Sequence, residues 1–332
     1  MGMLKIINGY RKGDQMELRE ARSSDFEQAF DLFKKAYETE REAVDALPKF
    51  SDTEPLARER LKTMFEKHKG LVALKDSEVV GYFFYALTGE LFGKSEGALV
   101  PLIGHASKKK NKIEIYQSLL NEAGKRWVSN NKLSWVVTCF EHDTVLEKLF
   151  FKNGFGQRCA DAIAFAEIRH EDQNEIKVIK ATMNDLKDIK DLHQEHVDFY
   201  QSSPLFMPGD DADEFEALKA SFNDPFTHIW TAYMEGEAVG YMRLSQVGES
   251  FISNSKDMAN VNAAYVKPTL RGRHIASGLL SALKEYVIDK TNYTRIGVDY
   301  ESINSTGSRF WEKHFMPYTK TLARRIDERI VK

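Results

Sequence analysis

The stretch Val266-Lys-Pro-Thr-Leu-Arg271-Gly272-Arg273-His274-Ile275-Ala276-Ser277-Gly-Leu-Leu280 joins a strand to a helix through a short basic turn. Pro268 ends the expected strand, because proline has no N–H to donate to a ladder. From Ile275 onward the apolar residues follow helical spacing. Free backbone N–H groups and the positive end of the helix dipole converge at such a turn. The stretch therefore predicts an anion site, to which Arg271 and Arg273 add charged donors.

The composition around this stretch is that of an ordinary globular protein. The chain has 332 residues, 42% of them hydrophobic, and a formal net charge of −3. This length is about twice that of a common domain and predicts two domains. The slightly acidic balance argues against a nucleic-acid partner, and no apolar run reaches the roughly 18 residues of a membrane span.

Two further sequence features bear on the compartment. Residues 1–12 lack the apolar segment and cleavage site of a secretion signal. Cys139 and Cys159 have no metal-ligand spacing and are too few for a disulfide framework. We therefore expect a cytoplasmic protein with reduced thiols, no metal and no membrane association.

The two halves of the chain repeat one pattern. Three pairs of segments match in order: 16–26 with 176–186, 71–83 with 229–242, and 150–155 with 310–315. The first pair reads as strand, cap and helix, the second reads as a hairpin containing Val-Gly-Tyr, and the third closes each half. A polar linker near residue 172 separates the halves. We expect an α/β (α+β) fold with domains at 15–170 and 176–332, each a mixed, mostly antiparallel sheet flanked by helices.

A second element follows the anion turn in the C-terminal half. Residues 294–304 read as a strand that ends at Asn304, and a helix follows through residues 308–313. Asn304 is a good helix cap, and a cofactor contact would be compatible with that role.

Here the residues resemble a known family, the GCN5-related N-acetyltransferase (GNAT) superfamily. Its acetyl-CoA motif is Arg or Gln, two residues, Gly, one residue, then Gly or Ala, and it opens the main helix. Arg271 and Ala276 match the two ends, whereas His274 stands where glycine is usual. In the family's second cofactor element, Asn-x-x-Ala-x-x-Phe-Tyr, Asn304 matches the Asn and Trp311 stands in place of the tyrosine that often serves as general acid.

This resemblance spans about residues 176–326 and implies a tandem GNAT protein with acetyl-CoA as cosubstrate. It implies transfer of acetyl to a primary amine of a small molecule or peptide, without a metal, by a monomer or homodimer. The implied cofactor-binding residues are Tyr265, Val266, Arg271, Gly272, Arg273, His274, Ile275, Ala276, Ser277 and Asn304. The alternative is a non-catalytic acyl-CoA sensor or scaffold of the same fold.

Acyl transfer itself requires an uncharged amine, an oxyanion donor and a base. The resemblance places the donor at the backbone of residues 265–266. The candidate bases are Asp299, Glu301 and Glu249. Tyr300 and Tyr318 are either proton donors or structural tyrosines, and acid help is not essential because a thiolate leaves readily.

The N-terminal half departs from the motif at residues 100–112, where the Arg-x-x-Gly-x-Gly/Ala pattern is missing. Lys108–Lys112 is either a remaining phosphate contact or a solvated loop. His142-Asp143 is either a structural pair or part of a substrate cleft. We expect this half to be a degenerate GNAT-like domain that supports its partner and forms one wall of the substrate cleft. The acidic run at residues 210–214 is either a solvated loop or an attractant for a cationic amine.

Overall fold

The computed structural model describes residues 16–168, 176–208, 216 and 218–331. The linker near residue 172 and the acidic run at residues 210–214 lie outside these ranges. The chain forms two compact units: unit 1 comprises residues 1–43, 54–156 and 321–332, and unit 2 comprises residues 44–53 and 157–320. Among the described helices, none is both long and apolar enough to cross a membrane.

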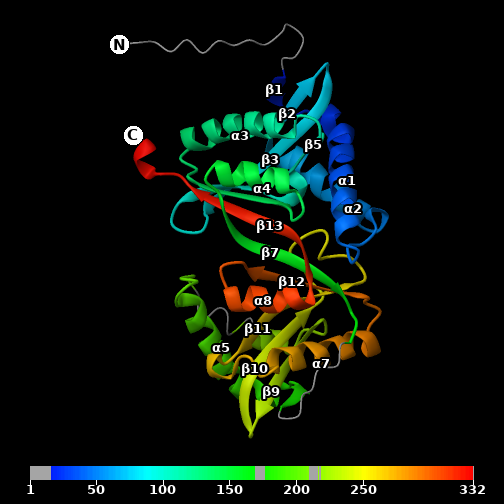
Figure 1. Cartoon of the computed structure of the whole chain (residues 1–332), viewed down its shortest axis with the longest axis vertical. Helices are drawn as coiled ribbons and strands as arrows, with labels where there is room; N and C mark the ends of the chain where they lie inside the picture. Colours follow the sequence, from blue (N-terminus) through cyan, green and yellow to red (C-terminus); the bar gives the residue numbers. More distant parts are fainter. Residues whose placement is uncertain (1–15, 169–175, 209–215, 217, 332) are drawn as a thin grey trace. The chain divides into compact units, whose positions relative to one another are not determined.

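Unit 1 is built on a mixed sheet (Figure 1). Its strands run in the order β1-β2-β3-β4-β6, followed by the end of β13, and β5 pairs with β3. The elements are β1 (Glu17–Glu20), α1 (Phe26–Ala43), α2 (Phe50–Lys67), β2 (Lys69–Lys75), β3 (Glu78–Glu90), β4 (Glu96–Val100), η2 (Leu102–Gly104), β5 (His105–Ser107), α3 (Lys112–Ser129), β6 (Ser134–Phe140) and α4 (Thr144–Lys152).

Alternation along β3 gives unit 1 two packed faces. Phe83 joins the buried cluster that contains Trp127 of α3, and their ring centroids are 6.1 Å apart. The next residue, Phe84, points to the other face and meets Phe65 of α2 at 4.5 Å. The sheet is therefore covered by α3 and α4 on one side and by α1 and α2 on the other.

Unit 2 repeats this layout, with strand order β13-β7-β12-β11-β10-β9-β8. Its elements are β7 (Gly156–Phe165), β8 (Lys177–Lys180), η3 (Met183–Asp185), α5 (Leu186–Gln201), β9 (Thr227–Met234), β10 (Glu237–Ser245), β11 (Met258–Val266), η4 (Pro268–Leu270), α7 (Ile275–Lys290), β12 (Arg295–Glu301), α8 (Ser305–His314) and β13 (Met316–Arg325). One buried cluster joins α7 and α8 to one face of the sheet, and a smaller cluster joins α5 to the other face.

The two units confirm the predicted fold class. Each sheet is mostly antiparallel, and the described strands of each unit include one parallel pair, β4 with β6 and β11 with β12. A helix follows each of these parallel strands in the same order, α3 and α4 in unit 1 and α7 and α8 in unit 2. The internal repeat in the sequence is therefore also a repeat of structure.

The last strand of each sequence half belongs largely or partly to the compact unit that is built mainly from the other half. β7 pairs antiparallel with β12 from Phe165↔Arg295 to Cys159↔Glu301. The end of β13 belongs to unit 1, where the hydroxyls of Thr321 and Thr138 are 2.8 Å apart. The compact units thus differ from the halves 15–170 and 176–332, which remain a prediction about the duplicated segments.

Candidate functional site

The candidate site of unit 2 begins where two parallel strands part. β11 and β12 are paired from Met258↔Arg295 to Val261↔Val298, although β11 continues for five residues and β12 for three beyond that point. The register of β11 against β10 shifts just there, so that Asn262 is an extra, bulged residue. A bulge bends its strand. The strands consequently diverge and leave a cavity of about 330 Å³ between them.

The cavity reaches both faces of the sheet. Val298 and Tyr300 of β12 belong to the cluster beneath α7 and α8, whereas Tyr265 of β11 belongs to the cluster beneath α5. All three residues line the cavity, together with residues of α5, β10, α7 and α8. Two ligands can therefore meet between the strands, one from each face.

The N-terminus of α7 forms one wall of this cavity. The turn before it contains two left-handed residues, Gly272 at φ 80° and His274 at φ 60°. The first bond of the helix runs from the Gly278 N–H to the His274 carbonyl at 2.9 Å. The N–H groups of the first turn, at Ile275, Ala276 and Ser277, precede that bond and have no carbonyl within the helix to receive them. All three residues line the cavity, so it contains the backbone donors and dipole of an anion site.

The two arginines of the turn, Arg271 and Arg273, have different surroundings. The Arg271 Nε donates to the Val266 carbonyl at 3.2 Å, and its guanidinium lies 4.4 Å from the centre of the Phe199 ring. Burial lowers the pKa of Arg271. Arg273 is exposed and is absent from the cavity lining, which includes every other predicted cofactor residue. Arg271 thus braces the end of β11 against α5 in addition to facing the cavity.

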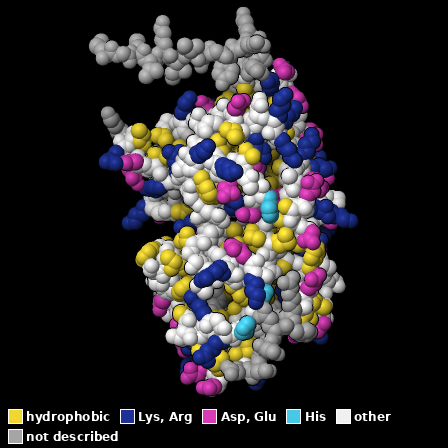
Figure 2. Space-filling view, in the orientation of Figure 1, with side chains coloured by type: hydrophobic (Ala, Val, Ile, Leu, Met, Phe, Trp, Pro, Cys, Tyr) yellow, Lys and Arg dark blue, Asp and Glu magenta, His cyan; other side chains and the backbone are white. Residues whose placement is uncertain are grey.

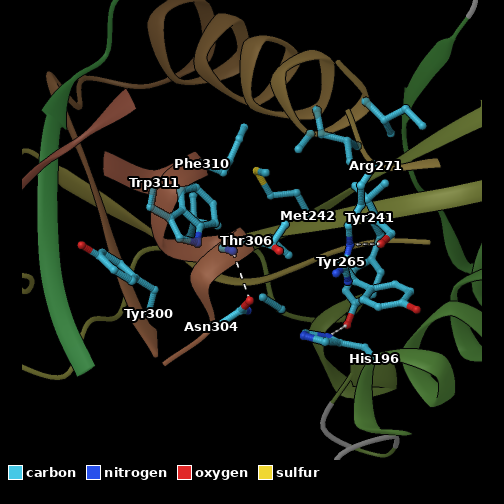
Figure 3. Close-up of a pocket in the computed structure, with 18 of the residues that line it drawn as sticks. His196, Tyr241, Met242, Tyr265, Arg271, Tyr300, Asn304, Thr306, Phe310 and Trp311 are labelled. Atoms are coloured by element: carbon cyan, nitrogen blue, oxygen red, sulfur yellow. Dashed lines mark hydrogen bonds between the residues drawn. The ribbon is translucent and has the colours of Figure 1, made fainter. Parts of the chain in front are cut away.

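The N-terminus of α8 forms the opposite wall (Figure 3). The Asn304 Oδ1 accepts the Gly307 N–H at 3.1 Å and caps the helix. A Cβ at Gly307 would lie 2.8 Å from the Asn304 Nδ2, so glycine in this position leaves room for the cap. Trp311 is buried and packs against Phe310 at 4.8 Å. Both aromatic rings line the cavity and give its end an apolar surface.

The three predicted catalytic residues occupy β12 and differ in environment. Tyr300 is buried, and its hydroxyl donates to the Glu312 Oε1 at 3.4 Å. The Glu301 Oε2 lies 3.4 Å from the Arg158 Nε. Burial raises the pKa of Glu301 and the charge of Arg158 opposes the shift. Both residues line the cavity, and both already have protein partners.

Asp299 lies directly after Val298, the last residue of β12 that pairs with β11, and lines the cavity. Its pKa is raised to about 6, first by burial and then by the negative charges of Glu249 and Asp161. Asp299 is exposed to solvent through the open cavity, and the desolvation that raises its pKa comes from the protein atoms packed around it in the concave wall. Asp161 is its register partner on β7. A carboxyl of this pKa can exchange protons near neutral pH.

The other residues considered for proton transfer lie outside the cavity lining. Glu249 acts on Asp299 through its charge, and Tyr318 is buried in the core. Sequence reasoning missed His196 and Tyr241, which line the cavity from α5 and β10. The signal was present in the spacing of His193 and His196, since residues three apart share one face of a helix.

The corresponding opening in unit 1 is bridged by protein side chains. β4 and β6 are paired from Gly97↔Ser134 to Val100↔Val137, after which β5 turns back to pair with β3. The buried His105 Nε2 lies 2.8 Å from the Thr138 carbonyl oxygen on β6. Lys112, the first residue of α3, donates from its Nζ to the Asp143 Oδ2 at 2.5 Å. Asp143 also caps α4, so an ion pair joins the N-termini of α3 and α4. In unit 2 the N-termini of the equivalent helices, α7 and α8, face the cavity.

Two of the remaining N-terminal candidates, Lys108 and His142, also have protein partners, whereas Lys109 and Lys110 are exposed. Lys108 pairs with Glu78 at 2.5 Å. The His142 Nδ1 lies 2.8 Å from the Glu40 Oε1. Among the described residues, no group of His, Cys, Asp or Glu is arranged to hold a metal ion.

Comparison with known proteins agrees with this geometry. Residues 189–315 match the sequence model of the Acetyltransferase (GNAT) family. The matched residues include the parted strands and the glycine-containing turn of unit 2, so this region is similar to a GNAT domain, in agreement with the resemblance in the sequence. A search of curated proteins found no match.

Solved structures of similar fold extend over both units. A GCN5-related N-acetyltransferase from Sphaerobacter thermophilus is 12% identical, with a TM-score of 0.60 and coverage of 94% of this chain and 96% of that one. A tandem GNAT protein from the clavulanic acid biosynthesis pathway is 13% identical, with a TM-score of 0.51 and coverage of 94% and 98%. A glucosamine N-acetyltransferase region of a fungal multi-domain β-N-acetylglucosaminidase is 12% identical, with a TM-score of 0.54 and coverage of 93% and 38%. The whole chain therefore has a tandem GNAT fold.

Proposed function

We propose that the protein is a cytoplasmic acetyl-CoA-dependent N-acetyltransferase with one cofactor site, in unit 2. The observation that carries this proposal is the cavity between β11 and β12, which has a helix N-terminus at one wall and Asp299 at another. The first turn of α7 is suited to the diphosphate of the cofactor. The rings of Trp311 and Phe310 and the capped end of α8 are suited to its pantetheine arm.

In this proposal the amine approaches from the α5 face. It arrives as an ammonium ion and must lose a proton before it attacks the thioester carbonyl. Asp299 is the base, since its raised pKa places its ionisation near neutral pH. Backbone N–H groups of β11 at residues 265–266 stabilise the oxyanion, because none of the described strands pairs with this segment on its β12 side.

The acceptor is a primary amine of a small molecule or peptide. On the face drawn in Figure 2, acidic and basic side chains are interspersed with each other, as the net charge of −3 suggests. This pattern favours a small or peptide acceptor over a nucleic acid, which would require a basic stripe.

The test is release of thiol from acetyl-CoA in the presence of a panel of primary amines. We expect amine-dependent release that Ala276→Asp reduces at least about tenfold, because a carboxylate in the first turn repels the diphosphate. That carboxylate also suits the helix dipole, so the fold is retained. Acetyl-CoA binding without release for any amine would instead support the alternative, a non-catalytic acyl-CoA sensor.

A further inference from the structure

One tyrosine hydroxyl connects two histidines beside the cavity. The Tyr241 hydroxyl lies 2.9 Å from the His196 Nδ1 and 3.2 Å from the His193 Nδ1. Tyr241 is fully buried. The two histidines are three residues apart on α5, so both imidazoles can reach the same atom.

This arrangement couples the protonation of the two rings. A tyrosine hydroxyl has one hydrogen to donate and an oxygen that can accept another. If Tyr241 donates to one Nδ1, the other imidazole must donate its own Nδ1–H to the Tyr241 oxygen. The two neutral histidines therefore have opposite tautomers, and shifting two protons along the bonds exchanges them.

Unlike His193, His196 lines the cavity, as Tyr241 also does. Its ring stacks on Tyr265 at 5.2 Å with an interplanar angle of 27°, and Tyr200 meets it edge-on at 5.0 Å. Burial lowers its pKa to about 3, and the charges of His193, Arg271 and Arg243 act in the same direction. A proton that reaches His196 is therefore not retained there.

Acetyl transfer from a thioester to an ammonium ion releases protons that this network could accept. The nitrogen loses one proton before it attacks the thioester and a second from the tetrahedral intermediate. One proton ends on the departing thiolate of CoA, and the other must leave the site. Asp299 provides for one of these transfers, and a second proton acceptor lets the other proton leave without Asp299 first having to release the one it holds.

We propose that His196, Tyr241 and His193 form a proton relay that carries the second proton out of the cavity. This inference rests on the proposed acetyl transfer. The His196 Nε2 takes a proton from the substrate nitrogen, its Nδ1–H passes to the Tyr241 oxygen, and the Tyr241 hydrogen passes to the His193 Nδ1. His196 and Tyr241 end neutral, and the positive charge lies on His193.

The coupling of the rings can be tested without any substrate. Full-length protein with 15N-labelled histidine side chains is studied by NMR at neutral pH, and His193→Gln and His196→Gln assign the two rings. We expect neutral rings of opposite or interconverting tautomer, and an independent tautomer for each ring in Tyr241→Phe. Two rings fixed as the same tautomer, or identical ring shifts in Tyr241→Phe, would overturn the relay.

The kinetic role is tested by thiol release from acetyl-CoA with the amine panel. Tyr241→Phe should lower kcat by about tenfold to a hundredfold and leave the KM for acetyl-CoA unchanged. It should also shift the pH–rate profile to higher pH. Tyr233→Phe is the matched control, because its hydroxyl bonds Asp188 of α5 at 3.0 Å outside the cavity. An unchanged kcat and pH profile in Tyr241→Phe would overturn the role. Failure of acetyl-CoA to bind the wild-type protein would instead count against the proposed function, and calorimetry detects it separately.

Discussion

His274 and Asn111 adopt the same left-handed conformation, with φ of 60° and 59°, immediately before the equivalent helices α7 and α3. The residue before the helix is therefore left-handed in both units, and it is not glycine in either. In unit 2 the turn faces the open cavity. In unit 1 the following residue, Lys112, forms the ion pair that bridges the opening.

The first prediction concerns this shared conformation. His274→Gly should raise the free energy of unfolding by about 0.5–1 kcal/mol, because glycine adopts a positive φ without the clash of a Cβ. It should also strengthen acetyl-CoA binding, since the diphosphate can approach the backbone more closely. Denaturant unfolding and calorimetry measure the two effects. Asn111→Gly is the matched control, with a smaller gain in stability and unchanged affinity; weaker binding by His274→Gly would show that the imidazole itself contacts the cofactor.

The second prediction separates the two roles of Asn304. Asn304→Ala should lower the free energy of unfolding by about 1 kcal/mol, because the cap of α8 is lost. Asn304→Asp keeps the acceptor oxygen, as Asp143 does in unit 1, and should retain stability. We expect both variants to weaken acetyl-CoA binding several-fold, because neither has an amide N–H. Full affinity in Asn304→Asp would mean that the residue only caps the helix.

The third prediction concerns the base. The pKa of Asp299 is raised to about 6, so kcat should rise with pH around that value as the carboxylate forms. Asp299→Asn should lower kcat about a hundredfold and remove this step from the pH–rate profile. Glu301→Gln, whose parent carboxylate pairs with Arg158, should have a much smaller effect. If Asp299→Asn retains the wild-type profile, another group takes the proton.

Ionisation of Asp299 also changes the free energy of unfolding with pH, in a direction that follows from its raised pKa. Since its folded pKa lies above the ordinary aspartate value, the folded state loses stability as pH rises through the interval up to about 6. Asp299→Asn should therefore be more stable than the wild type above this interval, which is a common property of active-site substitutions.

The fourth prediction concerns His105, one of the side chains that bridge the opening in unit 1. Burial lowers the pKa of His105 to about 4, whereas the unfolded chain binds this proton near pH 6.5. Stability should therefore fall as pH decreases from about 6.5 to about 4, by up to about 1.4 kcal/mol per pH unit from this residue. His105→Gln should reduce that slope in urea unfolding. His68→Gln, elsewhere in unit 1, should leave it in place, and equal slopes in all three proteins would contradict the assignment.

Much of the fold could be predicted from the sequence because its signals are local. The repeat of strand, cap and helix, and the Val-Gly-Tyr hairpins, were enough to indicate a duplicated sheet with flanking helices. The motif from Arg271 to Ser277 located the helix N-terminus, and every predicted cofactor residue except Arg273 lines one cavity. Arg273 differs because it lies on the outer side of the turn, which spacing alone does not specify.

The other features depend on contacts between segments that lie far apart in the sequence. The pairing of β7 with β12 joins residues 159–165 to residues 295–301 within unit 2, and a repeat in the sequence cannot reveal it. The approach of His196 to Tyr241 requires α5 to pack over β10. The bridging of unit 1 by Lys112 and Asp143 joins residues 31 positions apart. Because the final strands enter the other unit, binding is best tested on the full chain and not on separate halves.

The central claim is one acetyl-CoA site, at the N-terminus of α7, and calorimetry on the full chain tests it most directly. We predict one molecule bound per chain, an affinity at least about tenfold lower in Ala276→Asp, and no change in Ile113→Asp. Ile113 is the equivalent residue of α3, exposed at the helix N-terminus of unit 1, so the matched change places the same charge at the other repeat. Two molecules per chain, no binding, or equal weakening by both substitutions would contradict the account.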